Sequence, residues 1–195
     1  MKRAALGIKM HSGWGVIVVV SGDAASGEVI ERRRIVVMDA AIAGSKQPFH
    51  YAEEFELPAA ETYIANCTLE TNRLAAAAIE ESVNNLAARG YKIAGAALLI
   101  ASGKLLPGLS QILASHTLIH TAEGEFYREA AKKACERLKI SVTPMREKDL
   151  DELARKSFGA KASQIQDRIA KMGKSIGPPW TSDHKAATLA AWMIL

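Results

Sequence analysis

The segment Val16-Ile17-Val18-Val19-Val20 is apolar and β-branched at every position, and this pattern constrains the fold of the whole chain. A strand with one face in water alternates apolar and polar side chains, whereas a strand without that alternation is covered on both faces. The segment therefore suits a strand in a sheet that is covered on both faces. The 195 residues of the chain are enough to build such a sheet in a single domain, 1–195, without disulfides or metal ions.

Three strand-like runs fill the first forty residues, at positions 4–10, 14–20 and 28–38. Turn-forming residues separate them at 11–13 and 22–27, which predicts two successive hairpins. In the third run, Arg32 and Arg34 share a face with Ile30, and charged residues also occupy the opposite face. Such charges suit an edge strand, because they discourage pairing with other chains.

The rest of the chain alternates helices and short strands. Pro58 and Gly90 are typical of the start and end of a long helix, and Thr121 is a good N-cap for a later one. Residues 93–101 are short and almost wholly apolar, which indicates a buried parallel strand reached through a helical crossover. Residues 44–57 look irregular. Helices are expected at 58–89, 107–120, 122–138, 147–156, 162–172 and 182–194, and a further strand at 140–143. The pattern predicts an α/β fold with a mixed five-stranded sheet, three antiparallel N-terminal strands followed by two parallel ones.

Composition excludes several classes of protein. Cys67 and Cys135 lie far apart, so we expect two small buried residues in a reducing, cytoplasmic compartment rather than a disulfide framework. The apolar run behind Lys2 and Arg3 stops at Lys9, too early for a signal peptide, and no stretch approaches the ~20 apolar residues of a membrane span. We therefore expect no membrane partner.

Positive charge is concentrated in the C-terminal third of the chain. Residues 126–195 carry 14 basic and 8 acidic side chains, against 11 and 13 in residues 1–125. This imbalance is compatible with a surface that binds a polyanion such as nucleic acid, and equally with solvated helix faces.

Three segments resemble the RuvC-type Holliday-junction resolvases. Residues 6–17 resemble that family's Gly-Ile-Asp-Pro-Gly turn and the Thr-Gly-Tyr-Gly-Val strand after it. Residues 161–166 are similar to its Lys-x-x-Gln-Val-Gln helix, and residues 183–191 to its Asp-Ala-Ala-Asp-Ala-Leu-Ala terminal helix. The resemblance covers nearly the whole chain and implies a ribonuclease H-like fold.

That family hydrolyses phosphodiesters with two metal ions, held by carboxylates of the first strand, the fourth strand and the terminal helix. In this chain the position of the first-strand carboxylate is Lys9. The fourth strand ends in residues 101–104, which include no carboxylate. In the terminal helix Asp183 is present, but the position of its partner carboxylate, three residues later, is Ala186. Two neighbouring divalent ions need several anionic oxygens. We therefore expect the nuclease chemistry of the family to be absent.

A second set of residues surrounds Lys9 in the expected fold. Lys9 should pair with Asp183 or hold a phosphate, and His11 and His184 should reach the same face, with Lys185 beside them. Asp183, His184 and His11 are candidate catalytic residues, and Lys9 and Lys185 are candidate phosphate-binding residues. Two solvent-exposed histidines in loops are the simpler interpretation of the two imidazoles.

His116, His120 and Glu123 form a candidate metal site. One continuous helix would place the three on one face, where two imidazoles and a carboxylate suit zinc or a similar ion. A helix start at Thr121 would instead misalign them, and Glu123 would serve the first turn of the new helix.

Three functions remain open at this point. The first is a nucleic-acid-binding or assembly module without two-metal chemistry, the second an enzyme with a rebuilt His/Asp phosphoester-hydrolysing site, and the third a homo-oligomeric interaction domain. Whether the chain is an enzyme, and which cofactor it would use, stays undetermined by the sequence.

Overall fold

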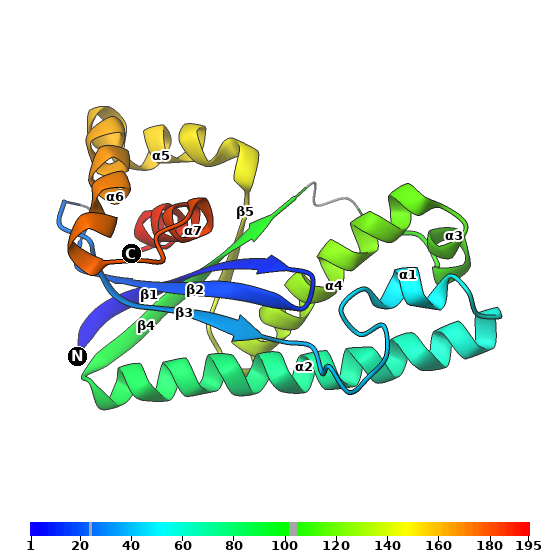
Figure 1. Ribbon diagram of the computed structural model, residues 1–195. Coiled ribbons are helices and arrows are strands. Elements are labelled where there is room, and N and C mark those ends of the chain that lie inside the picture. Colours follow the sequence, from blue (N-terminus) through cyan, green and yellow to red (C-terminus); the bar gives the residue numbers. More distant parts are fainter. Residues whose placement is uncertain (24, 102–104) are drawn as a thin grey trace.

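A five-stranded sheet forms the centre of the computed structural model, which describes residues 1–23, 25–101 and 105–195 (Figure 1). The strands are β1 (Lys2–His11), β2 (Trp14–Ser21), β3 (Glu28–Val36), β4 (Tyr91–Ile100) and β5 (Val142–Arg146). They lie in the order β3-β2-β1-β4-β5. The pairs β1–β2 and β2–β3 are antiparallel, whereas β1–β4 and β4–β5 are parallel. The predicted mixed sheet is confirmed, with the charged strand β3 at an edge.

Helices cover both faces of this sheet. One face carries α2 (Leu57–Ala88) and α4 (His116–Arg137); the other carries α7 (Ser182–Met193), against which α5 (Leu150–Phe158) and α6 (Ala162–Ile176) pack. In β2, Ile17 and Val19 belong to the first core, while Val16, Val18 and Val20 belong to the second. Each of these side chains is almost fully buried. The uninterrupted apolar segment therefore reflects a strand covered on both sides.

Close packing of α7 on β1 fixes the position of the terminal helix. A Cβ on Gly7 would lie 1.9 Å from the backbone oxygen of Ala187, so only glycine fits at this crossing. Asp183 lies one helical turn before Ala187, and Lys9 lies two residues after Gly7 along β1. Since one turn of helix and two residues of strand each span ~6 Å, the crossing brings Asp183 beside Lys9.

Three local predictions are wrong. Helix α4 begins at His116 and continues through Thr121, whose hydroxyl donates to the carbonyl of Thr117 within the helix instead of capping a new one. The segment read as irregular contains α1 (Pro48–Ala52), which is too short to show a helical period. Strand β5 continues through Pro144 to Arg146, because an edge strand tolerates proline.

Helix α1, together with α3 (Leu109–Leu113) and the adjoining ends of α2 and α4, extends beyond the sheet (Figure 1). This extension has its own small core of four buried side chains, Phe49, Ile112, Ile119 and Ala122. Two 3-10 turns, η1 (Glu147–Asp149) and η2 (Gly159–Lys161), complete the regular structure. Ala24 in the second predicted turn, and Ser102, Gly103 and Lys104 after β4, lie outside the described residues.

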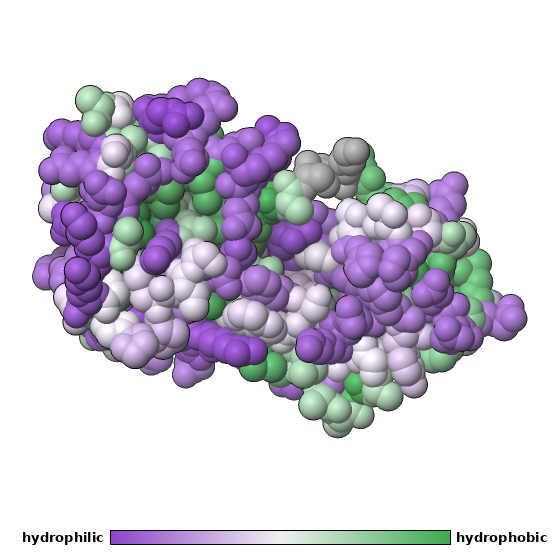
Figure 2. All heavy atoms as spheres, turned by 45° about the horizontal axis from the view of Figure 1, so that its top comes forward, coloured by the Kyte–Doolittle hydropathy of each residue, from purple (hydrophilic) through white to green (hydrophobic). Residues whose placement is uncertain are grey.

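Cys67 and Cys135 are both free and buried, as the sequence predicts. No helix in the described ranges combines the length and the apolar character needed to cross a membrane. Hydrophilic side chains dominate the surface formed by α5 and α6 (Figure 2), where several of the C-terminal lysines and arginines are exposed. Part of the basic excess therefore lies on solvated helix faces.

Candidate functional site

Lys9 lies near the carboxyl end of β1 and contacts two carboxylates. Its Nζ is 2.9 Å from Asp183 Oδ1 in the first turn of α7 and 2.6 Å from Glu147 Oε1 at the start of η1. The side chains of Lys9 and Asp183 are only 15% and 17% exposed, so this is a partly buried ion pair rather than a surface one. The pairing of Lys9 with Asp183 agrees with the sequence prediction.

Glu147 was not among the predicted site residues. It follows β5 directly, and because β5 is parallel to β1 and β4, its carboxyl end lies at the same edge of the sheet. Ending the predicted strand at Pro144 placed Glu147 in a helix and hid this relation. Extending the predicted strand through Pro144 to Arg146 would have placed Glu147 at the edge of the sheet beside Lys9.

Opposing effects set the ionisation of this pair. Partial burial opposes the charged form of Lys9, but hydrogen bonds and charge from Glu147 and Asp183 outweigh it and raise the pKa of Lys9. Burial likewise opposes ionisation of Asp183, and the contacts with Lys9 and His11 outweigh it, so the pKa of Asp183 is lowered. Both residues are therefore charged at neutral pH.

His11 contacts the second carboxylate oxygen of Asp183. Its Nε2 lies 3.0 Å from Asp183 Oδ2 and, facing an acceptor, carries the hydrogen. The imidazole stacks on Trp14 with ring centroids 4.3 Å apart, and the guanidinium of Arg34 lies 4.1 Å from the Trp14 ring. Trp14 is half-buried and forms part of the site.

His184 is buried and does not join His11 in an exposed pair. Its Nδ1 accepts hydrogen bonds from the amide and the hydroxyl of Thr181, at 3.3 Å and 2.8 Å, which caps helix α7. Burial, followed by the nearby charge of Arg32, lowers the pKa of His184, so the ring stays neutral at pH 7. Lys185 lines a separate hollow with Glu147 and Asp151.

Two hollows adjoin the Lys9–Asp183 pair. One, of about 370 Å³, is lined by apolar residues together with Lys9, Arg128, Glu147 and Lys148. Within the described part of the chain, the buried Nε of Arg128 has no hydrogen-bond partner. The other hollow is lined by Trp14, Arg34, Asp183 and His184, so His184 lies at the same face as Asp183, as the sequence predicts. Cationic groups therefore flank Asp183 on both sides.

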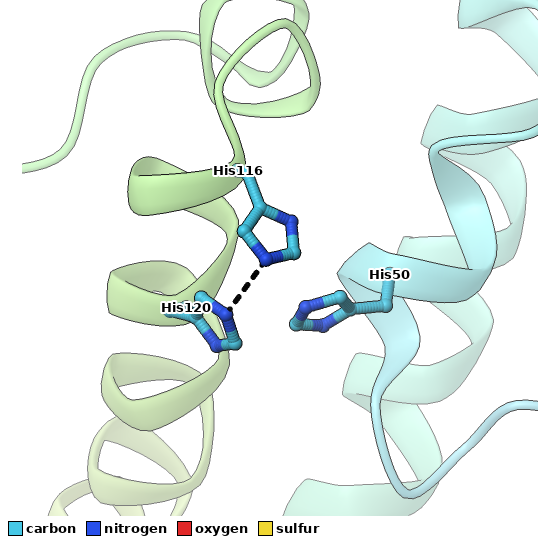
Figure 3. Close-up of side chains that lie close together, drawn as sticks. All are labelled: His50, His116 and His120. Atoms are coloured by element: carbon cyan, nitrogen blue, oxygen red, sulfur yellow. Dashed lines mark hydrogen bonds between the residues drawn. The ribbon is translucent and has the colours of Figure 1, made fainter.

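The predicted metal ligands lie elsewhere, in the helical extension. His116 and His120 are adjacent on α4, with their Nε2 atoms 3.1 Å apart, and His50 of α1 faces them (Figure 3). Glu123 does not point at the exposed pair: it is 3% exposed, and its Oε1 contacts the backbone amides of Phe49 and His50 and the ring of His50. His50 was missed because it falls in the segment read as irregular.

Solved structures resemble the fold, whereas sequence comparisons do not identify the chain. The structure of Thermus thermophilus RuvC in complex with a Holliday junction substrate is similar, with a TM-score of 0.53, 10% identity, and coverage of 98% of this chain and 91% of that one. A second Thermus thermophilus RuvC structure has a TM-score of 0.53 and 9% sequence identity, and the match covers 97% of this chain and 91% of that one. No protein-family model and no curated protein sequence matches. At this identity the likeness establishes the ribonuclease H-like fold alone.

Proposed function

We propose that the chain is a ribonuclease H-like domain that binds nucleic acid, alone or within an assembly, without two-metal hydrolysis. One observation carries this proposal: Lys9 Nζ lies between Asp183 and Glu147, 2.9 Å and 2.6 Å from their oxygens. The sequence resemblance implies that Lys9 takes the position of that family's first-strand, metal-binding aspartate. A fixed ammonium there supplies positive charge itself and repels a divalent ion.

The donor set at this edge does not fit a pair of divalent ions. Such ions require several free anionic oxygens. Both oxygens of Asp183 already have partners, because Oδ1 pairs with the ammonium of Lys9 and Oδ2 with the ring of His11. In the described ranges, neither Asp183 nor Glu147 belongs to a group of three or more His, Cys, Asp or Glu side chains that could hold one ion. We therefore derive no metal-dependent step at this edge.

Nucleic acid fits the cations that remain. Lys148 and Arg34 are exposed on opposite sides of the Lys9–Asp183 pair. Arg128, in the wall of the first hollow, is already paired with Glu125 at 2.9 Å. Lysine and arginine bind phosphate oxygens by charge-assisted hydrogen bonds. The solved RuvC structure with a Holliday junction substrate makes a four-way junction the first ligand to test.

The test is an anisotropy titration of labelled four-way junction, duplex and single-stranded DNA. For two or three phosphate contacts, the affinity for at least one probe should fall about 10- to 50-fold between 50 and 200 mM salt. Arg34→Glu and Lys148→Glu should each weaken binding by about 10-fold or more. Lys92→Glu is the matched control, because it makes the same charge change on an exposed residue at the opposite end of the sheet. No salt-sensitive binding, or an equal loss in the control, would contradict the proposal.

A phosphoester-hydrolysing enzyme is the second candidate, favoured by the His11–Asp183 contact of 3.0 Å. With Nε2 held by the carboxylate, Nδ1 of a neutral His11 could accept a proton from an attacking water, while Asp183 positions the ring. Activity on a panel of phosphate mono- and diesters should then fall at least 100-fold in His11→Ala and Asp183→Asn. Activity that survives both changes excludes this site.

A further inference from the structure

Three imidazoles converge in the helical extension, away from the Lys9 edge. His50 comes from α1, and His116 and His120 come from successive turns at the start of α4 (Figure 3). One nitrogen from each ring lies within 4.8 Å of the other two. His116 and His120 are exposed and His50 is half-buried, so an ion could reach the group from solvent.

The spacing of the two α4 histidines matches a metal-bound pair. Their Nε2 atoms are 3.1 Å apart, and two nitrogens bound to one tetrahedral zinc at ~2.05 Å would be separated by ~3.3 Å. Without a metal, this contact requires a proton on one of the two nitrogens and a lone pair on the other. A bound cation would replace that proton and accept both lone pairs.

Glu123 positions the third ring from behind. Its Oε1 accepts hydrogen bonds from the amides of Phe49 at 2.8 Å and His50 at 3.1 Å, and lies 3.2 Å from His50 Nδ1. A carboxylate at that nitrogen holds its hydrogen, which leaves the lone pair on Nε2. This is the arrangement in which a carboxylate orients a metal-binding histidine.

The other oxygen of Glu123 is an independent sign of a ligand. Glu123 Oε2 is buried and, among the residues that the structure describes, has no hydrogen-bond partner. A buried carboxylate with an unpaired oxygen is costly, and a cation bound to the neighbouring imidazole would compensate for its charge.

We propose that His50, His116 and His120 bind one first-row transition-metal ion, with zinc as the best fit, and that Glu123 positions His50. Imidazole nitrogens suit Zn²⁺, Co²⁺, Ni²⁺ and Cu²⁺, whereas Mg²⁺ and Ca²⁺ prefer oxygen ligands. Three protein ligands leave a fourth position for water or for another ligand. The ion joins α1 to α4 where the described residues of the extension form a small core of four buried apolar side chains and partly buried ones packed against them.

The test begins with full-length protein stripped by a chelator and titrated with Zn²⁺, using Co²⁺ as a spectroscopic probe. One equivalent of Co²⁺ should bind and give the visible spectrum of a tetrahedral ion, and Zn²⁺ should displace it. Zinc should also raise the melting temperature, because only the folded chain presents the site. His11→Ala is the control, since it removes a partly exposed histidine from the other region.

His50→Ala and His120→Ala separate a three-histidine site from simple surface binding. Each should lower zinc affinity at least 10-fold, while both metal-free variants still unfold cooperatively. If His120→Ala abolishes binding and His50→Ala leaves it unchanged, the ion is held by the α4 pair alone and the proposal is wrong. Absence of stoichiometric Zn²⁺ or Co²⁺ binding to the wild-type protein would also overturn it.

Glu123→Gln tests the positioning role. Glutamine keeps an oxygen for the two backbone amides, so the melting temperature of the metal-free protein should change little. Zinc affinity should nevertheless fall about 10-fold, since outer carboxylates of this kind contribute 10- to 100-fold. Unchanged affinity would remove Glu123 from the site.

Discussion

The Lys9 edge and the histidine cluster both gather polar residues that are distant in sequence, but they differ in the charge they present. At the edge, Asp183 and Glu147 are compensated by a lysine built into β1. In the extension, three imidazoles meet beside a buried carboxylate, one oxygen of which has no hydrogen-bond partner among the described residues. The first region therefore carries its own cation as a side chain, whereas at the second we propose that a bound metal ion supplies it. The two carboxylates at the edge are therefore a poorer indication of a metal site in this chain than the three imidazoles of the extension.

The largest expected effect comes from separating α7 from β1. Gly7→Ala places a Cβ 1.9 Å from a backbone oxygen, so the helix must shift, and with it Asp183. We expect a loss of about 3 kcal/mol in the free energy of unfolding, measured by urea denaturation. Zinc affinity should not change in the folded variant. Gly108→Ala is the control, because nothing lies within 4 Å of its added Cβ, and it should cost well under half as much.

The coupling between Lys9 and Asp183 comes next in size. Lys9→Met leaves two carboxylates at the edge without their cation and should cost about 1–2 kcal/mol of unfolding free energy. In a double-mutant cycle with Asp183→Asn, the interaction energy should be about 1 kcal/mol or more. Strict additivity of the two substitutions would show that the ion pair contributes nothing.

The pH dependence of stability reports the same pair. The pKa of Asp183 is lowered in the folded state, so its contribution is present at neutral pH and is lost as the pH falls below about 4. The pKa of Lys9 is raised, so its contribution is complete below about pH 10 and is lost at higher pH. The free energy of unfolding, measured by urea denaturation, should therefore fall less between pH 5 and pH 3 in the Asp183→Asn variant than in the wild type. Parallel profiles would contradict this assignment.

The smallest expected effect is that of zinc on the Lys9 edge. The two regions share no residue, so their free energies should add. DNA affinity should change less than 2-fold between zinc-loaded and chelator-treated protein in the same anisotropy assay. A larger change would show that the regions are coupled and that the ion acts on the nucleic-acid surface.

Much of the fold could be predicted from the sequence because its signals were strong and repeated along the chain. The unbroken apolar run at residues 16–20 indicated a sheet covered on both faces, and the charges of β3 placed it at an edge. The neighbourhood of Lys9 and Asp183 also followed from the resemblance and the order of elements. These features depend on patterns that extend over many residues.

The missed residues depend on short elements whose neighbours are set by tertiary packing. Glu147 reaches Lys9 because an edge strand tolerates Pro144, and local turn propensity gives the opposite prediction. His50 lies on a five-residue helix, and only the packing of α1 on α4 brings it to His116 and His120. Glu123 lies on the predicted helix, but its side chain is buried and contacts His50 instead of joining His116 and His120 as a ligand.

A cleavage assay decides whether Lys9 takes the place of metal-dependent chemistry at the sheet edge, as we propose. Wild-type protein is incubated with labelled four-way junction, duplex and single-stranded DNA, with Mg²⁺, with Mn²⁺ or with chelator, at concentrations that saturate binding. We expect bound DNA and no cleavage product under any of these conditions, because Lys9 occupies the space between Asp183 and Glu147. Divalent-ion-dependent cleavage that disappears in Asp183→Asn would contradict this expectation.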